Sequence, residues 1–81
     1  MAKFRKKPVV IEAVRFDGRN HPEVMDFMGE KPRPSSHPFL IISTLEGDMT
    51  ALPGDWIIKG VMGEFYPCKA HIFDETYEAA E

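Results

Sequence analysis

The chain has 81 residues, a formal net charge of −3, 43% hydrophobic residues and 28% charged residues. A chain of this length forms one small domain, residues 1–81, with a thin core, and its composition is typical of a soluble globular protein. No stretch approaches the roughly 18 uninterrupted apolar residues of a membrane-spanning helix. The apolar run Val9–Val14 is interrupted by Glu12, so no secretion signal is expected. The single cysteine excludes an internal disulfide and favours a reducing cytoplasm.

Charge is distributed unevenly along the chain. Residues 1–45 carry a net charge of +3 and residues 46–81 a net charge of −6. The basic part is concentrated in an N-terminal arm, residues 1–7, which holds four of the ten Lys and Arg residues. Such an arm either contacts phosphate groups or is solvated and keeps the first strand from pairing with other chains. Because the protein as a whole is acidic, we expect the second role and no nucleic-acid partner.

The N-terminal half predicts one strand, one short helix and a loop. Residues 9–16 are rich in β-branched side chains and apolar on both alternating faces, which predicts a central strand. A short helix follows, with Asn20 as its cap and Glu23 completing a capping box, and Gly29 ends it. Residues 30–38 contain three prolines and predict an irregular loop.

The remaining residues predict short strands joined by turns. Glu46-Gly47-Asp48 and the glycine-containing stretch 60–63 provide the turns of two hairpins. The residues after the second hairpin are compatible with a strand throughout or with one helical turn followed by a strand, and we favour a turn at residues 70–73 followed by a short strand. The strands expected in this half span residues 39–45, 49–52, 56–59, 64–68 and 75–78.

Together these elements predict an α+β fold: a mostly antiparallel β-sheet of five to six short strands with one short helix. A sheet in so small a chain needs cover on one face, from the helix or from curling into a partial barrel. Its exposed edges also call for closure or for pairing with a second copy. This favours a homo-oligomer over a monomer.

Most of the chain carries a recognisable motif pattern. The pattern consists of an N-terminal segment, two segments in the second half of the chain and a C-terminal group of residues. These are Phe4-Arg5-Lys6-Lys7-Pro8-Val9-Val10-Ile11-Glu12-Ala13, Pro53-Gly54-Asp55-Trp56-Ile57-Ile58-Lys59-Gly60, Gly63-Glu64-Phe65-Tyr66-Pro67-Cys68-Lys69, Phe73 and Thr76-Tyr77-Glu78. This pattern resembles a family of small proteins encoded by tailed bacteriophages and prophages. The resemblance implies a phage-encoded protein that acts in the cytoplasm of the bacterial host. By analogy with other small phage proteins, such a protein would bind and inhibit host machinery or trap a nucleotide signal used in host defence.

The sharpest local signal is the segment Pro53–Trp56. Pro53-Gly54 predicts a turn. In the structural interpretation, Asp55 accepts hydrogen bonds from backbone donors of that turn and Trp56 anchors the core.

A binding interpretation uses the same region as a ligand site. Trp56 or Tyr66 would stack on a flat base or sugar, while Lys59 or Lys69 would meet a phosphate. Alternation along the strand places Trp56 on one face and Lys59 on the other. The register of the next strand then decides whether Lys59 and Tyr66 share a face, which is where we expect the ligand.

Cys68 and His71 have the spacing of half a zinc site. No second Cys or His pair completes it, and His21 and His37 stand alone in the sequence. A cysteine and a histidine can also act as a nucleophile and its general base, but the sequence does not indicate a third residue that would orient the histidine. We therefore interpret Cys68 as a half-buried structural thiol and expect no metal and no cofactor.

Glu12 is an acid within an otherwise apolar strand. If it were buried it would need a partner, for which Arg15 and Lys59 are available. The simpler interpretation is that its side chain points outward.

The functional prediction is a non-enzymatic binding protein, because no catalytic constellation emerges. It would sequester a nucleotide-like molecule or cap a host protein, with Trp56, Lys59, Tyr66 and Lys69 as ligand-binding residues. Two alternatives stay open at this point: a small hydrolase that uses Cys68 and His71, and a structural or assembly accessory of the virion.

Overall fold

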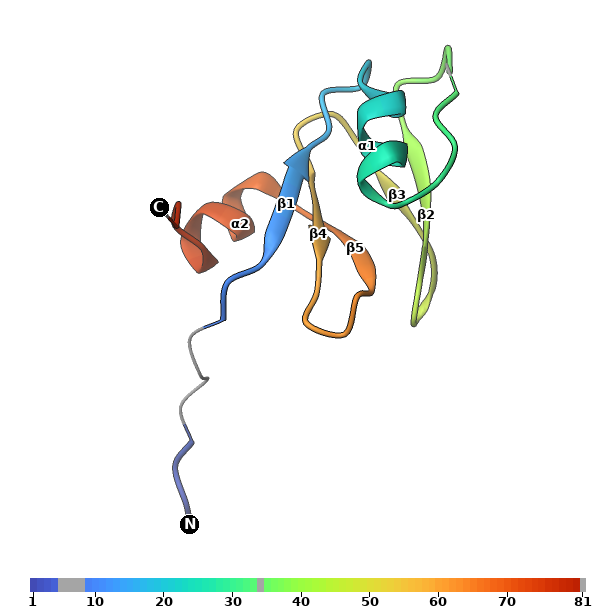
Figure 1. Ribbon diagram of the computed structural model, residues 1–81. Coiled ribbons are helices and arrows are strands. Elements are labelled where there is room, and N and C mark those ends of the chain that lie inside the picture. Colours follow the sequence, from blue (N-terminus) through green and yellow to red (C-terminus); the bar gives the residue numbers. More distant parts are fainter. Residues whose placement is uncertain (5–8, 34, 81) are drawn as a thin grey trace.

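The computed structural model describes residues 1–4, 9–33 and 35–80 and has five strands and two short helices (Figure 1). In chain order the elements are β1 (Glu12–Arg15), α1 (His21–Phe27), β2 (Leu40–Thr44), β3 (Gly47–Ala51), β4 (Trp56–Lys59), β5 (Phe65–Cys68) and α2 (Ala70–Thr76). The predicted α+β class is confirmed. The predictions for residues 5–7 of the arm and for Pro34 of the loop lie outside the described residues.

The strands form two antiparallel sheets instead of one (Figure 1). One sheet has the order β1–β4–β5, and the other is the β2–β3 hairpin. The expectation that β1 is central is wrong, since β4 occupies the middle of the three-stranded sheet. β1 is an edge strand without a buried residue: Glu12 and Arg15 are exposed, and Ala13 and Val14 are half-buried. No barrel closure joins the described strands.

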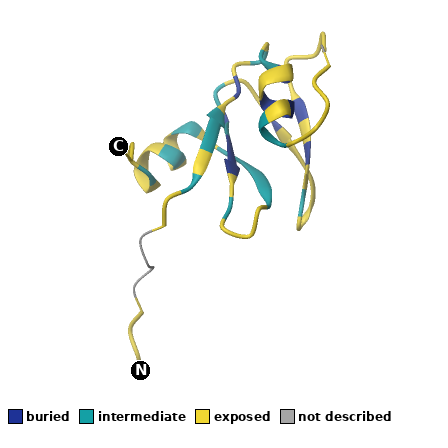
Figure 2. Cartoon of the chain, in the orientation of Figure 1, coloured by how far each residue is buried: buried dark blue, intermediate teal, exposed yellow. Residues whose placement is uncertain are grey.

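The main core lies between the two sheets and under α1. The hairpin packs beside β5, and α1 brings two buried residues, Val24 and Met25, into the same cluster. Figure 2 shows the buried positions on the strands, on α1 and just after β1, whereas α2 has none. The buried residues of this core cluster are Phe16, Val24, Met25, Leu40, Ile42, Ala51 and Ile57.

The predicted helix α1 begins and ends where the sequence indicates. Asn20 precedes it, but its side chain donates to the carbonyl of Arg15 and to the carboxylate of Glu23 and does not cap the helix backbone. The side chain of Asp17 accepts the Asn20 backbone N–H at 3.0 Å. Gly29 ends the helix with a φ of 78°, a conformation that favours glycine.

Both predicted hairpins form. The turn of the first lies at residues 45–46, one residue earlier than expected, because Gly47 already pairs with Thr44. Before β4, Pro53-Gly54 makes the expected turn: the Asp55 N–H donates to the Leu52 carbonyl at 3.0 Å, and Gly54 has a φ of 96°.

The C-terminal region differs from its prediction. Residues 70–76 form one continuous helix, α2, and no strand follows at residues 75–78. Phe73 and Tyr77 are four residues apart, so a helix brings both rings together on one side, whereas a strand would hold them about 13 Å apart. Of the helices that the structure describes, neither is long or apolar enough to span a bilayer.

Candidate functional site

The register of the three-stranded sheet decides which predicted site residues share a face. Residues directly opposite each other in antiparallel strands point to the same face. Ile58 pairs with Tyr66, and Trp56 pairs with Cys68, so all four lie on one face, here called the α2 face. Lys59 pairs with Phe65 on the opposite face. The question that the sequence left open is therefore answered: Lys59 and Tyr66 do not share a face.

Trp56 holds α2 against this face through a stack of aromatic rings. The Trp56 and Phe73 ring centroids are 4.3 Å apart, and the rings are within 8° of parallel. Phe73 in turn contacts Tyr77, with centroids 5.1 Å apart. Trp56 is only half-buried and lies outside the main core cluster. The expectation that it anchors the core is therefore wrong in detail, because its partner is α2.

A groove of about 1070 Å³ lies between the α2 face, α2 and the chain segments at both ends. Three acids line it, Glu64, Asp74 and Glu78, and no Lys or Arg does so among the described residues. Its aromatic part joins β4 and β5 to α2. The complete lining is Val9, Val10, Ile11, Ala13, Trp56, Gly60, Val61, Glu64, Tyr66, Phe73, Asp74, Thr76, Tyr77, Glu78, Ala79 and Ala80.

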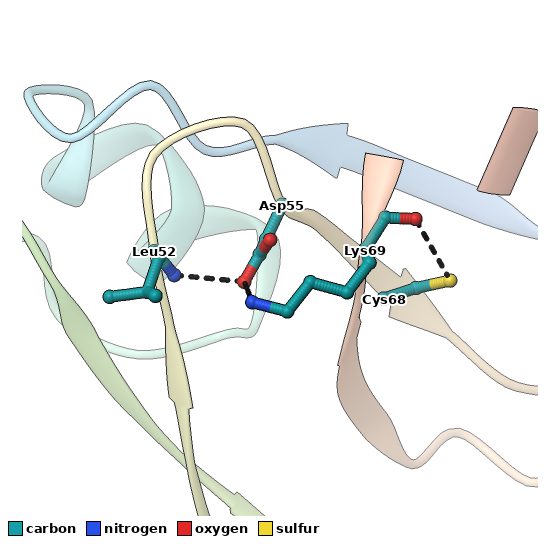
Figure 3. Close-up of polar contacts among 4 residues, drawn as sticks. All are labelled: Leu52, Asp55, Cys68 and Lys69. Carbon is teal, nitrogen blue, oxygen red and sulfur yellow. Dashed lines mark hydrogen bonds and ion pairs between the residues drawn. The ribbon is translucent and has the colours of Figure 1, made fainter. Parts of the chain in front are cut away.

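Lys69, the fourth predicted ligand residue, has a structural partner. Its Nζ lies 3.4 Å from Oδ2 of Asp55, and the same oxygen accepts the Leu52 N–H at 2.9 Å (Figure 3). Asp55 is buried, so these two donors compensate its desolvation. The predicted bond from Asp55 to a backbone donor of the turn is confirmed. Of the four predicted site residues, the groove brings together Trp56 and Tyr66 only.

The Cys68 environment does not favour a nucleophile. Burial, and then the negative charge of Asp55, raises the pKa of the Cys68 thiol, so the thiolate that reacts as a nucleophile is disfavoured. Its Sγ donates to the Lys69 carbonyl at 3.6 Å (Figure 3). His71 is exposed on α2, and the hydrogen bond of the Cys68 thiol goes to the Lys69 carbonyl and not to His71. Within the same part of the chain, no three His, Cys, Asp or Glu side chains gather as metal ligands would.

Glu12 is exposed, as its outward-pointing interpretation predicted. It sits directly opposite Lys59 in the ladder between β1 and β4. The two opposite charges therefore occupy a neighbouring pair on the sheet face away from α2.

His21 is a buried polar residue that the sequence interpretation treated only as a lone histidine. Its Nε2 lies 2.9 Å from the Phe39 carbonyl, and its ring meets the Phe16 ring edge-on at 5.0 Å. Nδ1 has no hydrogen-bond partner among the described residues. The sequence feature that could have indicated a structural role for His21 is its place at the first position of α1, directly before Pro22. The contact ties the end of the 30–38 loop to α1.

Stability is expected to fall as the pH rises from about 10 to about 12, through Tyr66. Burial first, and the neighbouring Tyr77 next, raise the pKa of Tyr66 to about 12, whereas an unfolded tyrosine ionises near pH 10. Between these values the native state binds more protons than the unfolded state, so the free energy of unfolding decreases with pH. Urea unfolding at a series of pH values measures this slope, and Tyr66→Phe should flatten it. Ionisation of Tyr66 near pH 10 in the folded protein, seen as the ultraviolet absorbance change that Tyr66→Phe removes, would contradict the expectation.

The chain matches no protein-family model, no curated protein and no solved structure. The relationship to a phage-encoded family therefore stays a prediction from the motif pattern, and the evidence for function comes from the groove on the α2 face.

Proposed function

We propose that this is a non-enzymatic binding protein whose groove on the α2 face holds a basic segment of another protein. The observation that carries the proposal is the composition of the groove lining: a run of aromatic rings from Trp56 to Tyr77, bordered by carboxylates and free of Lys and Arg in the described part of the chain. Aromatic faces attract Lys and Arg side chains through cation–π contacts. Carboxylates add favourable Coulomb energy, which also guides a cationic partner to the groove.

The same lining disfavours a nucleotide-like ligand. A phosphate in the groove would lie near Glu64, Asp74 and Glu78 without a cation from the described lining residues, and like charges repel. The two lysines considered for phosphate binding are engaged elsewhere: Lys59 is on the opposite face, and Lys69 is paired with Asp55. Of the two predicted modes of action, capping a protein is therefore better supported than sequestering a nucleotide.

The protein acts by occupancy and not by chemistry. A raised thiol pKa and an exposed, separate His71 give the Cys68 region no means to activate a nucleophile. In the setting that the phage resemblance implies, the bound segment belongs to a host protein, and binding blocks that protein's own interaction.

The test is a titration of the protein with a fluorescently labelled, end-blocked peptide of lysine and phenylalanine, followed by anisotropy. We expect salt-sensitive binding, weakened about two- to fivefold by Asp74→Asn and again by Glu78→Gln, the range for single exposed ion pairs. Glu46→Gln is the matched control, since Glu46 is an exposed acid in the turn between β2 and β3. ADP should not compete. Failure to bind the peptide, or equal losses in the control, would refute the proposal.

A further inference from the structure

We infer that the groove on the α2 face of one copy holds the N-terminal arm, residues 1–7, of a second copy, in a reciprocal arm-exchanged dimer. The inference rests on the proposed function, because it names an occupant of the same groove. It follows from the charge of the two surfaces and from the exposure of the arm's described residues.

The charges of the arm and of the groove are complementary. The arm contains four Lys and Arg residues and no acid, namely Lys3, Arg5, Lys6 and Lys7. The groove side contains three lining acids, and α2 adds the exposed Glu75 close by. A cationic segment is therefore part of every copy of the chain. It matches the chemistry that the groove requires.

The described residues of the arm offer apolar as well as charged contacts. Phe4 is 95% exposed, and Met1 is fully exposed. A large exposed aromatic ring beside cationic side chains is what an aromatic, acidic groove can bury. Phe4 therefore supplies a partner for the rings of Phe73 and Tyr77.

The exposure of Phe4 favours exchange between copies over binding within one copy. Val9 and Val10 line the groove and are themselves exposed. Phe4 is 95% exposed within a single copy, so its ring does not fill the groove of its own chain. The groove is therefore open to the arm of a second copy. Seven extended residues span about 23 Å, against about 10 Å for the seven residues of α2, so the arm is long enough to cover the helix.

A twofold arrangement makes both exchanges at once. Each copy gives its arm and receives the other, so the interface is self-complementary and the assembly closes as a dimer. Forming the first contact holds the second arm near its groove, which strengthens two individually modest ionic contacts. A basic segment from another protein must then compete with the arm for the groove.

A pair of charge-swapped full-length variants tests the exchange. The first variant carries an acidic arm and the natural groove: K3E, R5E, K6E and K7E. The second carries the natural arm and a basic groove: D74K and E78K. Sedimentation velocity should find the unmodified chain dimeric at low salt and dissociating as salt rises. Each variant alone should dimerise at least about tenfold more weakly, from the loss of several ion pairs. An equimolar mixture of the two should restore a heterodimer.

The outcomes separate this inference from the proposed function. A monomeric unmodified chain, a variant that still dimerises, or a mixture without heterodimer overturns the arm exchange. Protection of the groove within a monomer, seen as a change in Trp56 emission when the arm is altered, also overturns it. If the lysine–phenylalanine peptide still binds in those cases, the proposed function stands; if the peptide also fails to bind, both are refuted. Tighter peptide binding to the acidic-arm variant than to the unmodified chain supports both.

Discussion

Phe16→Ala is expected to remove about 3–5 kcal/mol from the free energy of unfolding, the usual cost of deleting a buried phenyl ring. The Phe16 side chain is completely buried and meets the His21 ring edge-on. Its backbone connects β1 to the turn before β4, because its N–H donates to the Asp55 carbonyl at 2.8 Å and its carbonyl accepts the Gly54 N–H at 2.7 Å. A domain of this length has only about 4–12 kcal/mol of stability in total. The loss is therefore a large share of it, and urea unfolding at low protein concentration measures it.

The control for this substitution is Leu45→Ala. Leu45 is 77% exposed in the turn between β2 and β3, so its truncation should change stability by less than about 0.5 kcal/mol. Equal effects of the two substitutions would mean that Phe16 is not the centre of the core. A conservative Phe16→Leu variant should recover much of the loss, since a leucine side chain fills part of the same volume.

The elements that local chemistry determines were predictable from the sequence. The turn at Pro53-Gly54 needs a fixed φ followed by a positive φ, and proline and glycine provide them. The hairpin of β4 and β5 follows from two short apolar runs around a glycine-containing turn, and β4 has the predicted bounds. Gly29 ended α1 for the same local reason.

The features that depend on contacts distant in sequence were not predictable. Residues 9–16 are apolar on both alternating faces, which is typical of a central strand, yet β1 lies at the edge of its sheet and its residues are exposed or half-buried. Residues 70–78 have side chains compatible with strand or helix, and the contact of Phe73 with Trp56 decides for the helix. Propensity over so short a segment is weaker than such a tertiary contact.

The candidate site was predicted only in part, because its geometry also depends on contacts between residues distant in sequence. Trp56 and Tyr66 were identified by residue type, and their common face depends on a register that alternation along one strand cannot give. Lys69 has the residue type of a phosphate ligand, but it follows β5 near the buried Asp55 and pairs with it. The acids of the groove belong to the acidic C-terminal part of the chain, where composition alone could not show that Asp74 and Glu78 border one cavity.

Phe73→Ala is expected to release α2 from the sheet and to abolish the groove. A helix of seven residues is well below the roughly 12–15 residues at which isolated helices become marginally stable. α2 also has no buried residue and no side-chain hydrogen bond at its N-terminal cap. Its attachment therefore depends on the Phe73 ring between Trp56 and Tyr77. Trp56 emission should shift to longer wavelength, amide exchange at residues 70–77 should accelerate, and binding of the lysine–phenylalanine peptide should weaken at least about tenfold, the equivalent of 1.4 kcal/mol.

The sheets should survive the loss of α2, because the main core contains no residue from that helix. The two effects are therefore separable: Phe16→Ala lowers global stability, whereas Phe73→Ala acts on the groove with a smaller shift in the urea midpoint. Ile72→Ala is the matched control, since Ile72 is 47% exposed on the same helix and alanine is a better helix former. It should leave Trp56 emission unchanged. Unchanged emission and slow exchange in Phe73→Ala would show that α2 is held by other contacts, and a groove that binds peptide without the ring would remove the physical basis of the proposed function.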